Sequence, residues 1–322
     1  MTSFIVILGV LAVVLHLYRQ SWTHRDLPQI YTGTFDGELM RVGETYIARR
    51  PGKAGSELSI ICFPGFLEDM RYFQALYQDH PAELILVNNA NYHQPFAALR
   101  ANTLHWPVNP YPLGTIEYDG FHLGLVVSEL AAGQQVMLHG HSRGGAVVLE
   151  AGRQYPEVML SAARKISAIL EAPVLPRARV VGRGSKPITN HIARYLLPIV
   201  LGLSRNNGPE KMARQPMMRP TSELKEALLP SLYSTARNYS TCVANLRSIY
   251  EWQQDTEFKI YTYYRQITVV IGARDDVLDN TSMRASAEEG AEINPGVTIL
   301  QTDNTNHFVS LEQPHYLLEL SR

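Results

Sequence analysis

Short, nearly continuous apolar runs recur along this chain, and most of them are followed by a segment with helical spacing. Such a run is typical of a strand buried on both faces of a parallel sheet, because parallel neighbours need a helical crossover between them. The pattern therefore predicts an α/β fold with a mainly parallel sheet flanked by helices. The predicted buried strands lie at residues 57–63, 82–89, 134–140, 165–172, 266–273 and 296–302.

Two segments depart from this alternation. Residues 37–52 have the pattern of a hairpin that ends at a Pro-Gly pair. Two predicted strands are separated by residues 173–265. A plain helical crossover between parallel strands needs only roughly 12 to 24 residues, so this segment is far too long for one. The long segment begins with a Pro/Gly/basic linker and continues with helix-like spacing. We interpret residues 176–256 as an inserted helical cap between two parts of the core. The linker is 173–187, the predicted cap helices are 188–203, 221–240 and 242–254, and the core parts are 26–175 and 257–322.

The composition excludes several classes of protein. The chain has 322 residues, of which 45% are hydrophobic, and this content excludes a disordered chain. Its 29 Lys and Arg nearly balance its 30 Asp and Glu, so no basic footprint for nucleic acid exists. Cys62 and Cys242 lie far apart, without metal-ligand spacing. We expect two structural thiols, no metal and no nucleic-acid partner.

The N-terminus has a membrane-like composition. Residues 4–18 are apolar except for His16. A cleaved signal peptide would have a positive start and a small-residue cleavage site, and neither is present. We therefore predict an uncleaved anchor within residues 1–25; a buried first helix of a soluble protein is the alternative. The nearby positive charges all follow the apolar stretch, which favours a cytoplasmic globular part. They are Arg19, Arg25, Arg41, Arg49, Arg50 and Lys53.

Ser142 lies between a predicted strand and a predicted helix. The string Gly140-His141-Ser142-Arg143-Gly144 matches G-x-S-x-G, in which small flanking residues allow a strained turn that exposes the serine hydroxyl at the end of the sheet. With this elbow, "GHSRGG", the chain resembles the α/β-hydrolase superfamily over roughly residues 30 to 322. The resemblance implies a nucleophilic serine, followed along the chain by an acid and then a histidine.

Three histidines follow the serine. His307 stands in "NHFVSLEQP", which resembles the histidine loop of the superfamily, so it is predicted to be the general base. His191 falls in the predicted cap and His315 in the terminal helix, and both are predicted to lie on the surface.

The acid has several candidates. The resemblance implies Gly-x-x-Asp followed by one variable and two apolar residues, and this register selects Asp275 in "GARDDVL". Asp276, at the variable position, and Glu171, after another strand, remain alternatives. Asp279 and Asn280 are expected to cap the next helix.

An oxyanion needs two preorganised N–H groups. The resemblance implies the backbone N–H of Arg143, the residue after the nucleophile, and that of Phe66 in "FPGF". Pro64 stands where the superfamily usually has a histidine, which leaves the N–H of Phe66 available.

These residues predict a serine hydrolase, without metal or organic cofactor, that cleaves an ester or thioester of a hydrophobic, lipid-like acyl group. An acyltransferase or C–C bond hydrolase with the same triad is the main alternative, and a non-catalytic binding protein on this fold is another. A serine at the elbow argues against epoxide opening and halide displacement, which use aspartate there, and against polyester synthesis, which uses cysteine.

Overall fold

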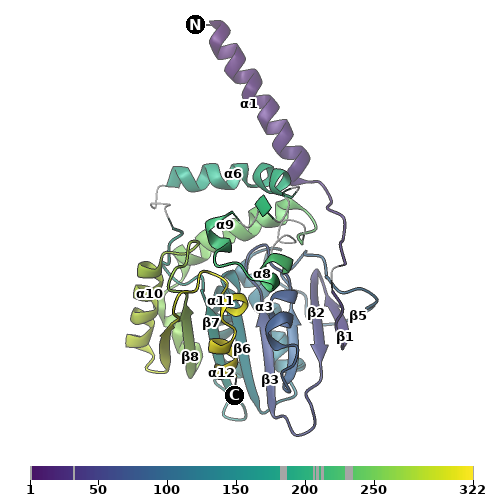
Figure 1. The fold of residues 1–322 in the computed structure, drawn as a ribbon, viewed down its shortest axis with the longest axis vertical. Coiled ribbons are helices and arrows are strands. Elements are labelled where there is room, and N and C mark those ends of the chain that lie inside the picture. The colour runs from purple at the N-terminus through teal and green to yellow at the C-terminus, as the bar shows by residue number, and fades with distance from the viewer. Residues whose placement is uncertain are drawn as a thin grey trace.

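One central sheet with helices on both faces forms the globular part (Figure 1). The computed structural model describes residues 2–31, 33–181, 187–205, 207, 210–211, 214–228 and 235–321. The strands are β1 (Glu38–Val42), β2 (Thr45–Arg50), β3 (Leu58–Phe63), β4 (Glu83–Val87), β5 (Ala101–Thr103), β6 (Gln135–His141), β7 (Lys165–Glu171), β8 (Gln266–Ile271) and β9 (Val297–Gln301). The helices are α1 (Thr2–Thr23), α2 (Arg71–Tyr77), α3 (Ile116–Glu129), α4 (Arg143–Gln154), α5 (Pro156–Met159), α6 (Pro187–Ser204), α8 (Glu223–Leu228), α9 (Tyr239–Asp255), α10 (Asn280–Ile293), α11 (Val309–Glu312) and α12 (His315–Leu320).

The sheet is mainly parallel, as predicted. Its order is β5-β1-β2-β4-β3-β6-β7-β8-β9, and β4 to β9 in this order run parallel. The predicted hairpin is confirmed: β1 and β2 pair antiparallel, and β2 also pairs antiparallel with β4. The chain leaves β3 for β4 on one side and later forms β6 on the other side of β3. In open α/β sheets, ligands bind at the carboxyl ends of strands at such a reversal.

Alternating side chains of each strand feed two separate cores. Ile61 and Phe63 of β3 belong to the core beneath α3, α4 and α10. Ile60 and Cys62 belong to the core on the opposite face, beneath α2, α11 and α12. This alternation explains why β3 reads as a continuous apolar run, since both of its faces are covered.

The segment between β7 and β8 lies over the carboxyl ends of the strands. The helices predicted at 188–203 and 242–254 correspond to α6 and α9. The helix predicted at 221–240 appears in part as α8, and residues 229–234 lie outside the described residues, as do residues 182–186 of the predicted linker. Asn91, just beyond β4, donates to Thr241 of α9 at 2.6 Å, which places this helix above the end of β4.

The two ends of the segment between β7 and β8 are hydrogen-bonded to each other. Gln253 of α9 donates through Nε2 to the carbonyl oxygens of Leu175 and Ala178 at 2.7 and 2.6 Å. The start of this segment is also hydrogen-bonded to the loop after β8: the N–H of Val181 donates to the Val277 carbonyl at 3.0 Å.

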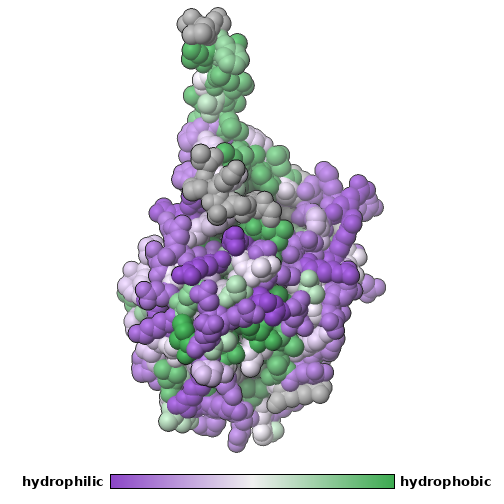
Figure 2. All heavy atoms as spheres, turned by 90° about the vertical axis from the view of Figure 1, so that its left-hand side faces the viewer, coloured by the Kyte–Doolittle hydropathy of each residue, from purple (hydrophilic) through white to green (hydrophobic). Residues whose placement is uncertain are grey.

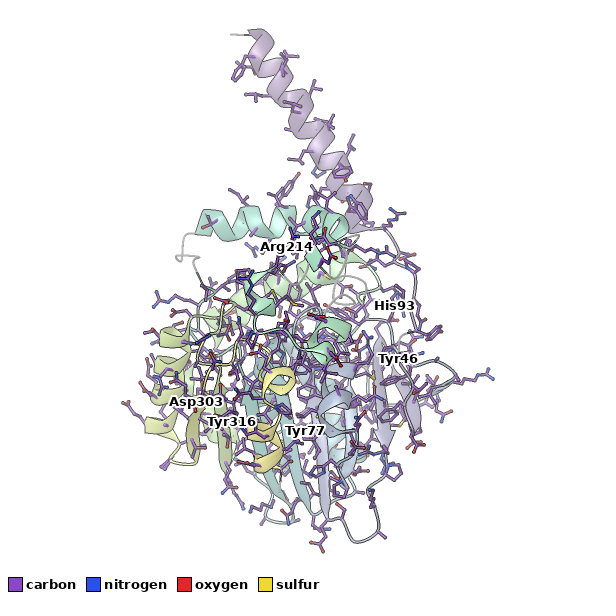
Figure 3. The ribbon with its side chains drawn as sticks, viewed as in Figure 1. Tyr46, Tyr77, His93, Arg214, Asp303 and Tyr316 are labelled. Carbon is purple, nitrogen blue, oxygen red and sulfur yellow. The ribbon has the colours of Figure 1, made fainter. Side chains whose placement is uncertain are left out.

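Helix α1 projects from the globular part (Figure 1). Residues Phe4–Thr23 are long and apolar enough to cross a membrane, with a mean hydropathy of 1.8, and none of the 18-residue apolar window within them is buried. Thr23, at the end of the helix, is buried. A membrane anchor and a signal sequence share these properties. The chain after α1 is hydrogen-bonded to the globular part through His93, which is labelled in Figure 3. His93 Nε2 lies 2.8 Å from the Leu27 carbonyl oxygen.

Candidate active site

Ser142 occupies a strained turn at the carboxyl end of β6. Its backbone angles, φ +52° and ψ −116°, lie in a region that residues other than glycine rarely adopt, so the surrounding structure must hold Ser142 in this conformation. The Ser142 N–H donates to the Glu171 carbonyl at 2.8 Å, and the Ser142 carbonyl accepts from the N–H of Val174 at 2.8 Å. These bonds fix the serine against the end of the neighbouring strand β7.

The glycines of the elbow are required by close backbone approach. A Cβ at Gly144 would lie 2.1 Å from the Phe63 carbonyl oxygen, and one at Gly140 would lie 2.3 Å from the Gly144 carbonyl oxygen. Neither position has room for a side chain. The pattern G-x-S-x-G therefore has a steric cause at this junction.

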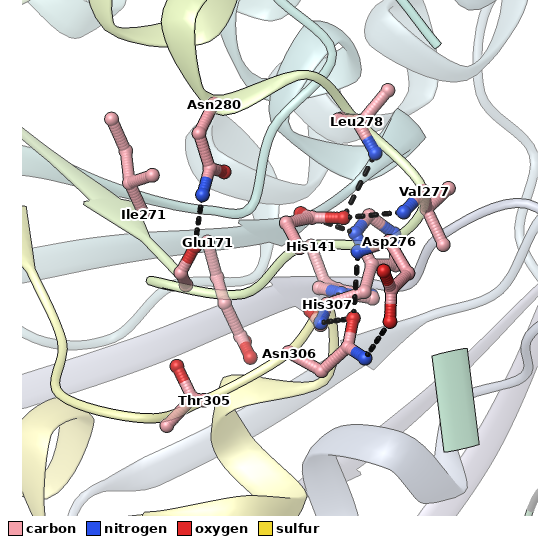
Figure 4. A network of polar contacts seen from close by, with 12 residues as sticks. His141, Glu171, Ile271, Asp276, Val277, Leu278, Asn280, Thr305, Asn306 and His307 are labelled. Carbon is pink, nitrogen blue, oxygen red and sulfur yellow. Dashed lines mark hydrogen bonds and ion pairs between the residues drawn. The ribbon is translucent and has the colours of Figure 1, made fainter. Parts of the chain in front are cut away.

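His307, which is labelled in Figure 4, lies in the loop after β9 and contacts Asp275 in the loop after β8. His307 Nδ1 lies 2.8 Å from Asp275 Oδ2, and both residues are almost fully buried. Asp275 Oδ1 accepts the N–H groups of Val277 and Leu278, each at 2.8 Å. Burial raises the pKa of Asp275, but the charge of His307 and these hydrogen bonds outweigh it, so the pKa lies below its ordinary value. The carboxylate is thus charged and aimed at the ring.

The two alternative acids point elsewhere. Asp276 Oδ2 accepts from Asn306 Nδ2 at 2.8 Å, and Asp276 is exposed. Glu171 accepts from the hydroxyl of Tyr72 at 2.7 Å and from the N–H of Ser310 at 2.6 Å. Among the described residues, neither carboxylate has a hydrogen bond to the His307 ring.

The remaining polar candidates have structural positions. Asp279 Oδ1 accepts the N–H of Ser282 at 2.8 Å, which confirms it as the cap of α10. Asn280 does not cap the helix; its amide donates to the Gly272 carbonyl at 2.9 Å. His191 and His315 are exposed, as predicted.

A buried Glu68–His141 pair supports the backbone of His307, and no sequence motif indicated this pair. His141 Nδ1 lies 2.8 Å from Glu68 Oε2, and His141 Nε2 lies 2.9 Å from the His307 carbonyl oxygen. Burial lowers the pKa of His141, but the charges of Glu68 and Glu171 outweigh it and raise the pKa to about 9. A charged imidazole donates through both nitrogens, so His141 fixes the backbone of His307.

This pair makes stability depend on alkaline pH. The folded pKa of His141, about 9, exceeds its ordinary value of 6.5, so its stabilisation is complete below pH 6.5 and is lost as pH rises through 9. The loss amounts to roughly 3 kcal/mol at most. We expect the free energy of urea unfolding to fall over this range, and to fall less in Glu68→Gln. Equal slopes in both proteins would contradict this. His122 does not interfere, because its pKa is lowered by burial to about 4.

The loop after β3 passes close to Ser142. A Cβ at Gly65 would lie 2.9 Å from Ser142 Cβ, so only glycine fits beside the serine. The Gly65 N–H donates to Glu68 Oε2 at 2.7 Å, and Phe66 follows at a half-buried position. Arg143 is the first residue of α4, where backbone N–H groups have no acceptor within the helix and carry the positive end of its dipole.

The side chain of Arg143 has a different role from its backbone. It is completely buried, and its Nη1 lies 2.7 Å from Asp119 Oδ2 and 2.8 Å from Asn89 Oδ1. Removing one partner of such a buried pair is strongly destabilising. This pair therefore anchors the start of α4, next to Ser142.

Two further expectations concern metals and thiols. Among the residues that the structure describes, no group of three His, Cys, Asp or Glu could hold a metal ion. Cys62 and Cys242 are both buried and unpaired, and burial raises the pKa of each thiol. Buried neutral thiols of this kind are poor nucleophiles.

The family model of the alpha/beta hydrolases matches residues 60–320, and the chain belongs to this family. A thermophilic esterase from Thermogutta terrifontis superposes with a TM-score of 0.58 at 17% identity, over 92% of this chain and 97% of that chain. A putative aryl esterase from Burkholderia cenocepacia gives 0.57 at 16% identity, over 86% and 96%. MenH from S. aureus gives 0.58 at 13% identity, over 85% and 96%.

At these identities the solved structures share the fold. Esterases and other hydrolases stand among them, and the fold of this chain is that of the α/β hydrolases. A comparison with curated proteins finds no significant match.

Proposed function

We propose that this hydrolase cleaves carboxylic ester or thioester bonds of hydrophobic acyl substrates, with Ser142, His307 and Asp275 as its triad. The observation that carries the proposal is the buried contact of 2.8 Å between Asp275 and His307 Nδ1, together with the strained turn at Ser142. A carboxylate at Nδ1 holds the ring so that Nε2 is the nitrogen available to the serine.

The reaction follows from these positions. Ser142 Oγ attacks the acyl carbon while His307 Nε2 takes its proton, and the oxyanion accepts hydrogen bonds from the N–H groups of Phe66 and Arg143. His307 then donates the proton to the departing alcohol or thiol. Water, deprotonated by the same nitrogen, attacks the acyl-enzyme and releases the acid. Asp275 keeps its charge throughout and stabilises the imidazolium.

An apolar cluster beside the oxyanion loop supports a hydrophobic acyl group. Leu201 of α6 and Tyr239 and Cys242 of α9 form one buried cluster, and Phe66 packs against it. The segment 176–256 thus acts as a cap that supplies apolar surface beside the reacting carbonyl, between core parts 26–175 and 257–322.

A series of p-nitrophenyl esters of increasing acyl length, compared with acyl-CoA thioesters, tests the proposal. We expect turnover on the esters, with kcat/KM rising as the acyl chain lengthens, because each buried methylene contributes about 0.8 kcal/mol. Full-length protein in a neutral detergent is the sample. Release of product only when an alcohol acceptor is added would identify an acyltransferase, and inertness towards all substrates would contradict a hydrolytic role.

We further propose that residues 1–25 anchor the protein in a membrane, with the globular part on the cytoplasmic side. The apolar side chains of α1 support this, because Phe4, Val6 and Leu17 are 65, 60 and 63% exposed and no part of the described chain covers them. Exposing so much apolar surface of one helix to water is unfavourable, and a large exposed apolar surface is typical of a membrane or protein contact.

Carbonate extraction of membranes tests the anchor. The full-length protein is expected to stay in the pellet, because about 20 apolar residues suffice to span the hydrocarbon core. The double variant Leu11→Arg/Val14→Arg should appear in the supernatant, since each charge costs roughly 2.5–3.5 kcal/mol at the centre of a membrane span. Arg284→Gln on the exposed face of α10 is the control and should remain membrane-bound. Full-length protein in the carbonate supernatant would contradict the anchor.

A further inference from the structure

A cavity of about 370 Å³ lies at the base of α1, where this helix meets α6 and α9. Its volume falls in the range of small-molecule sites. It is separate from the catalytic residues, none of which lines it. The lining residues are Arg19, His191, Arg194, Tyr195, Val243, Arg247 and Glu251.

The cavity carries an excess of positive charge. Three arginines and one glutamate line the cavity, and the glutamate is already engaged, because Glu251 Oε1 lies 2.6 Å from Arg247 Nε. Within the described part of the chain, no carboxylate pairs with Arg19 or Arg194. Arg194 Nη2 instead lies 2.9 Å from His191 Nδ1. Arg19 and Arg194 therefore line one cavity without a carboxylate partner, and such arginines favour an anionic ligand with several oxygen acceptors.

The cavity lies at the end of the apolar part of α1. Arg19 is the first charged residue after that stretch, and its Nε donates to the Tyr195 carbonyl at 2.8 Å. Its guanidinium carbon also lies 4.8 Å from the centre of the Tyr195 ring. With α1 across a membrane, Arg19 and the cavity fall at the depth of the lipid head groups.

Helix α6 presents apolar side chains next to the same position. Ile192, Val200 and Leu203 are 53, 52 and 58% exposed. Figure 2 shows hydrophobic residues along α1 and on the top of the globular part beside it. An apolar helix face that adjoins basic residues is typical of a helix that lies in the membrane interface.

We infer that this cavity binds the phosphate group of an anionic phospholipid, whose acyl chains lie beside α1 and the outer face of α6. The inference rests on the proposed insertion of α1. A water-soluble phosphate ester offers the same charge without acyl chains, and the exposed Ile192, Val200 and Leu203 favour the lipid. A lipid bound here would fix the depth and tilt of the cap relative to the membrane surface.

Binding to full-length protein in neutral detergent tests the inference, by native mass spectrometry with short-chain phosphatidylglycerol, phosphatidylcholine and glycerol 3-phosphate. We expect phosphatidylglycerol to bind best. The double variant Arg194→Gln/Arg247→Gln should weaken its binding roughly 25-fold, at about fivefold per arginine. Glu251→Gln should strengthen binding, because it removes the opposing charge. Arg284→Gln, on α10, is the matched control and should bind as the wild type does.

Equal binding of phosphatidylglycerol and phosphatidylcholine would overturn the inference, as would a double variant that binds like the control. Glycerol 3-phosphate binding as tightly as phosphatidylglycerol would also overturn it and would assign the cavity to a soluble phosphate ester. Because the measurement is made in detergent, failure here is distinguishable from failure of the anchor in carbonate extraction and from absence of esterase turnover.

Discussion

Replacing Ser142 by alanine is expected to lower the turnover of a p-nitrophenyl ester about a million-fold while the protein stays folded. Alanine keeps the Cβ and therefore the same backbone strain at φ +52°, so the turn is neither relieved nor made worse. The variant loses only the hydroxyl, which is the proposed nucleophile. Steady-state kinetics measures the first effect, and circular dichroism and the unfolding midpoint measure the second.

A fluorophosphonate probe makes the result specific to the nucleophile. The wild type should be labelled at Ser142, and Ser142→Ala should take up no label. Ser128→Ala is the matched control, because the Ser128 hydroxyl donates to the Leu125 carbonyl within α3, away from the elbow. Residual activity of Ser142→Ala within about tenfold of the wild type would rule out Ser142 as the nucleophile.

Asp275→Asn is expected to lower kcat about ten-thousand-fold. The asparagine keeps the shape and can still accept the N–H groups of Val277 and Leu278 through its oxygen. Its amide then faces His307 Nδ1 and donates to it, so the ring carries its proton on Nε2 and cannot accept one from Ser142. The loss should appear mainly in kcat, with a smaller fall in the free energy of unfolding, because the pKa of Asp275 is lowered in the folded protein.

Substitutions of the alternative acids separate catalysis from stability. Asp276→Asn should stay near the wild type, since Asp276 is exposed and bonds to Asn306. Glu171→Gln should reduce stability instead, because Glu171 is fully buried and accepts hydrogen bonds from Tyr72 and Ser310. Burial raises the pKa of Glu171, but the charge of His141 and the hydrogen bonds that Glu171 accepts outweigh burial and lower the pKa to about 2. A collapse of kcat in Asp276→Asn or Glu171→Gln, with Asp275→Asn near normal, would reassign the acid.

The strands were predictable because the physical signal is local. A run such as residues 57–63 reports burial on two faces by itself, and two cores indeed cover β3. The short edge strand β5 was not predicted. Its residues Ala101–Thr103 have no apolar pattern, and the strand exists because it pairs with β1 far along the chain.

The site was predictable where a motif fixes the backbone. The glycines around Ser142 indicate that the backbone approaches closely there, as the structure shows. The register that the family resemblance implies after Gly272 selects Asp275, the carboxylate that contacts His307. The Glu68–His141 pair could not be found in this way. It joins residues 73 positions apart, and neither neighbouring sequence contains a pattern that specifies the contact. Long-range polar pairs depend on the folded arrangement of loops.

The hydrogen bonds between the start of the inserted segment and the loop after β8 have a consequence for engineering. The N–H of Val181 donates a hydrogen bond to the Val277 carbonyl, and the N–H of Asp279 donates one to the Arg179 carbonyl. These two hydrogen bonds hold the chain up to residue 181 against the loop that contains Asp275. A chimera that exchanges the whole of residues 176–256 is therefore expected to disturb the proposed acid, Asp275, as well as the proposed substrate selection by the cap. An exchange that begins beyond residue 181 and retains Gln253 would transplant specificity alone.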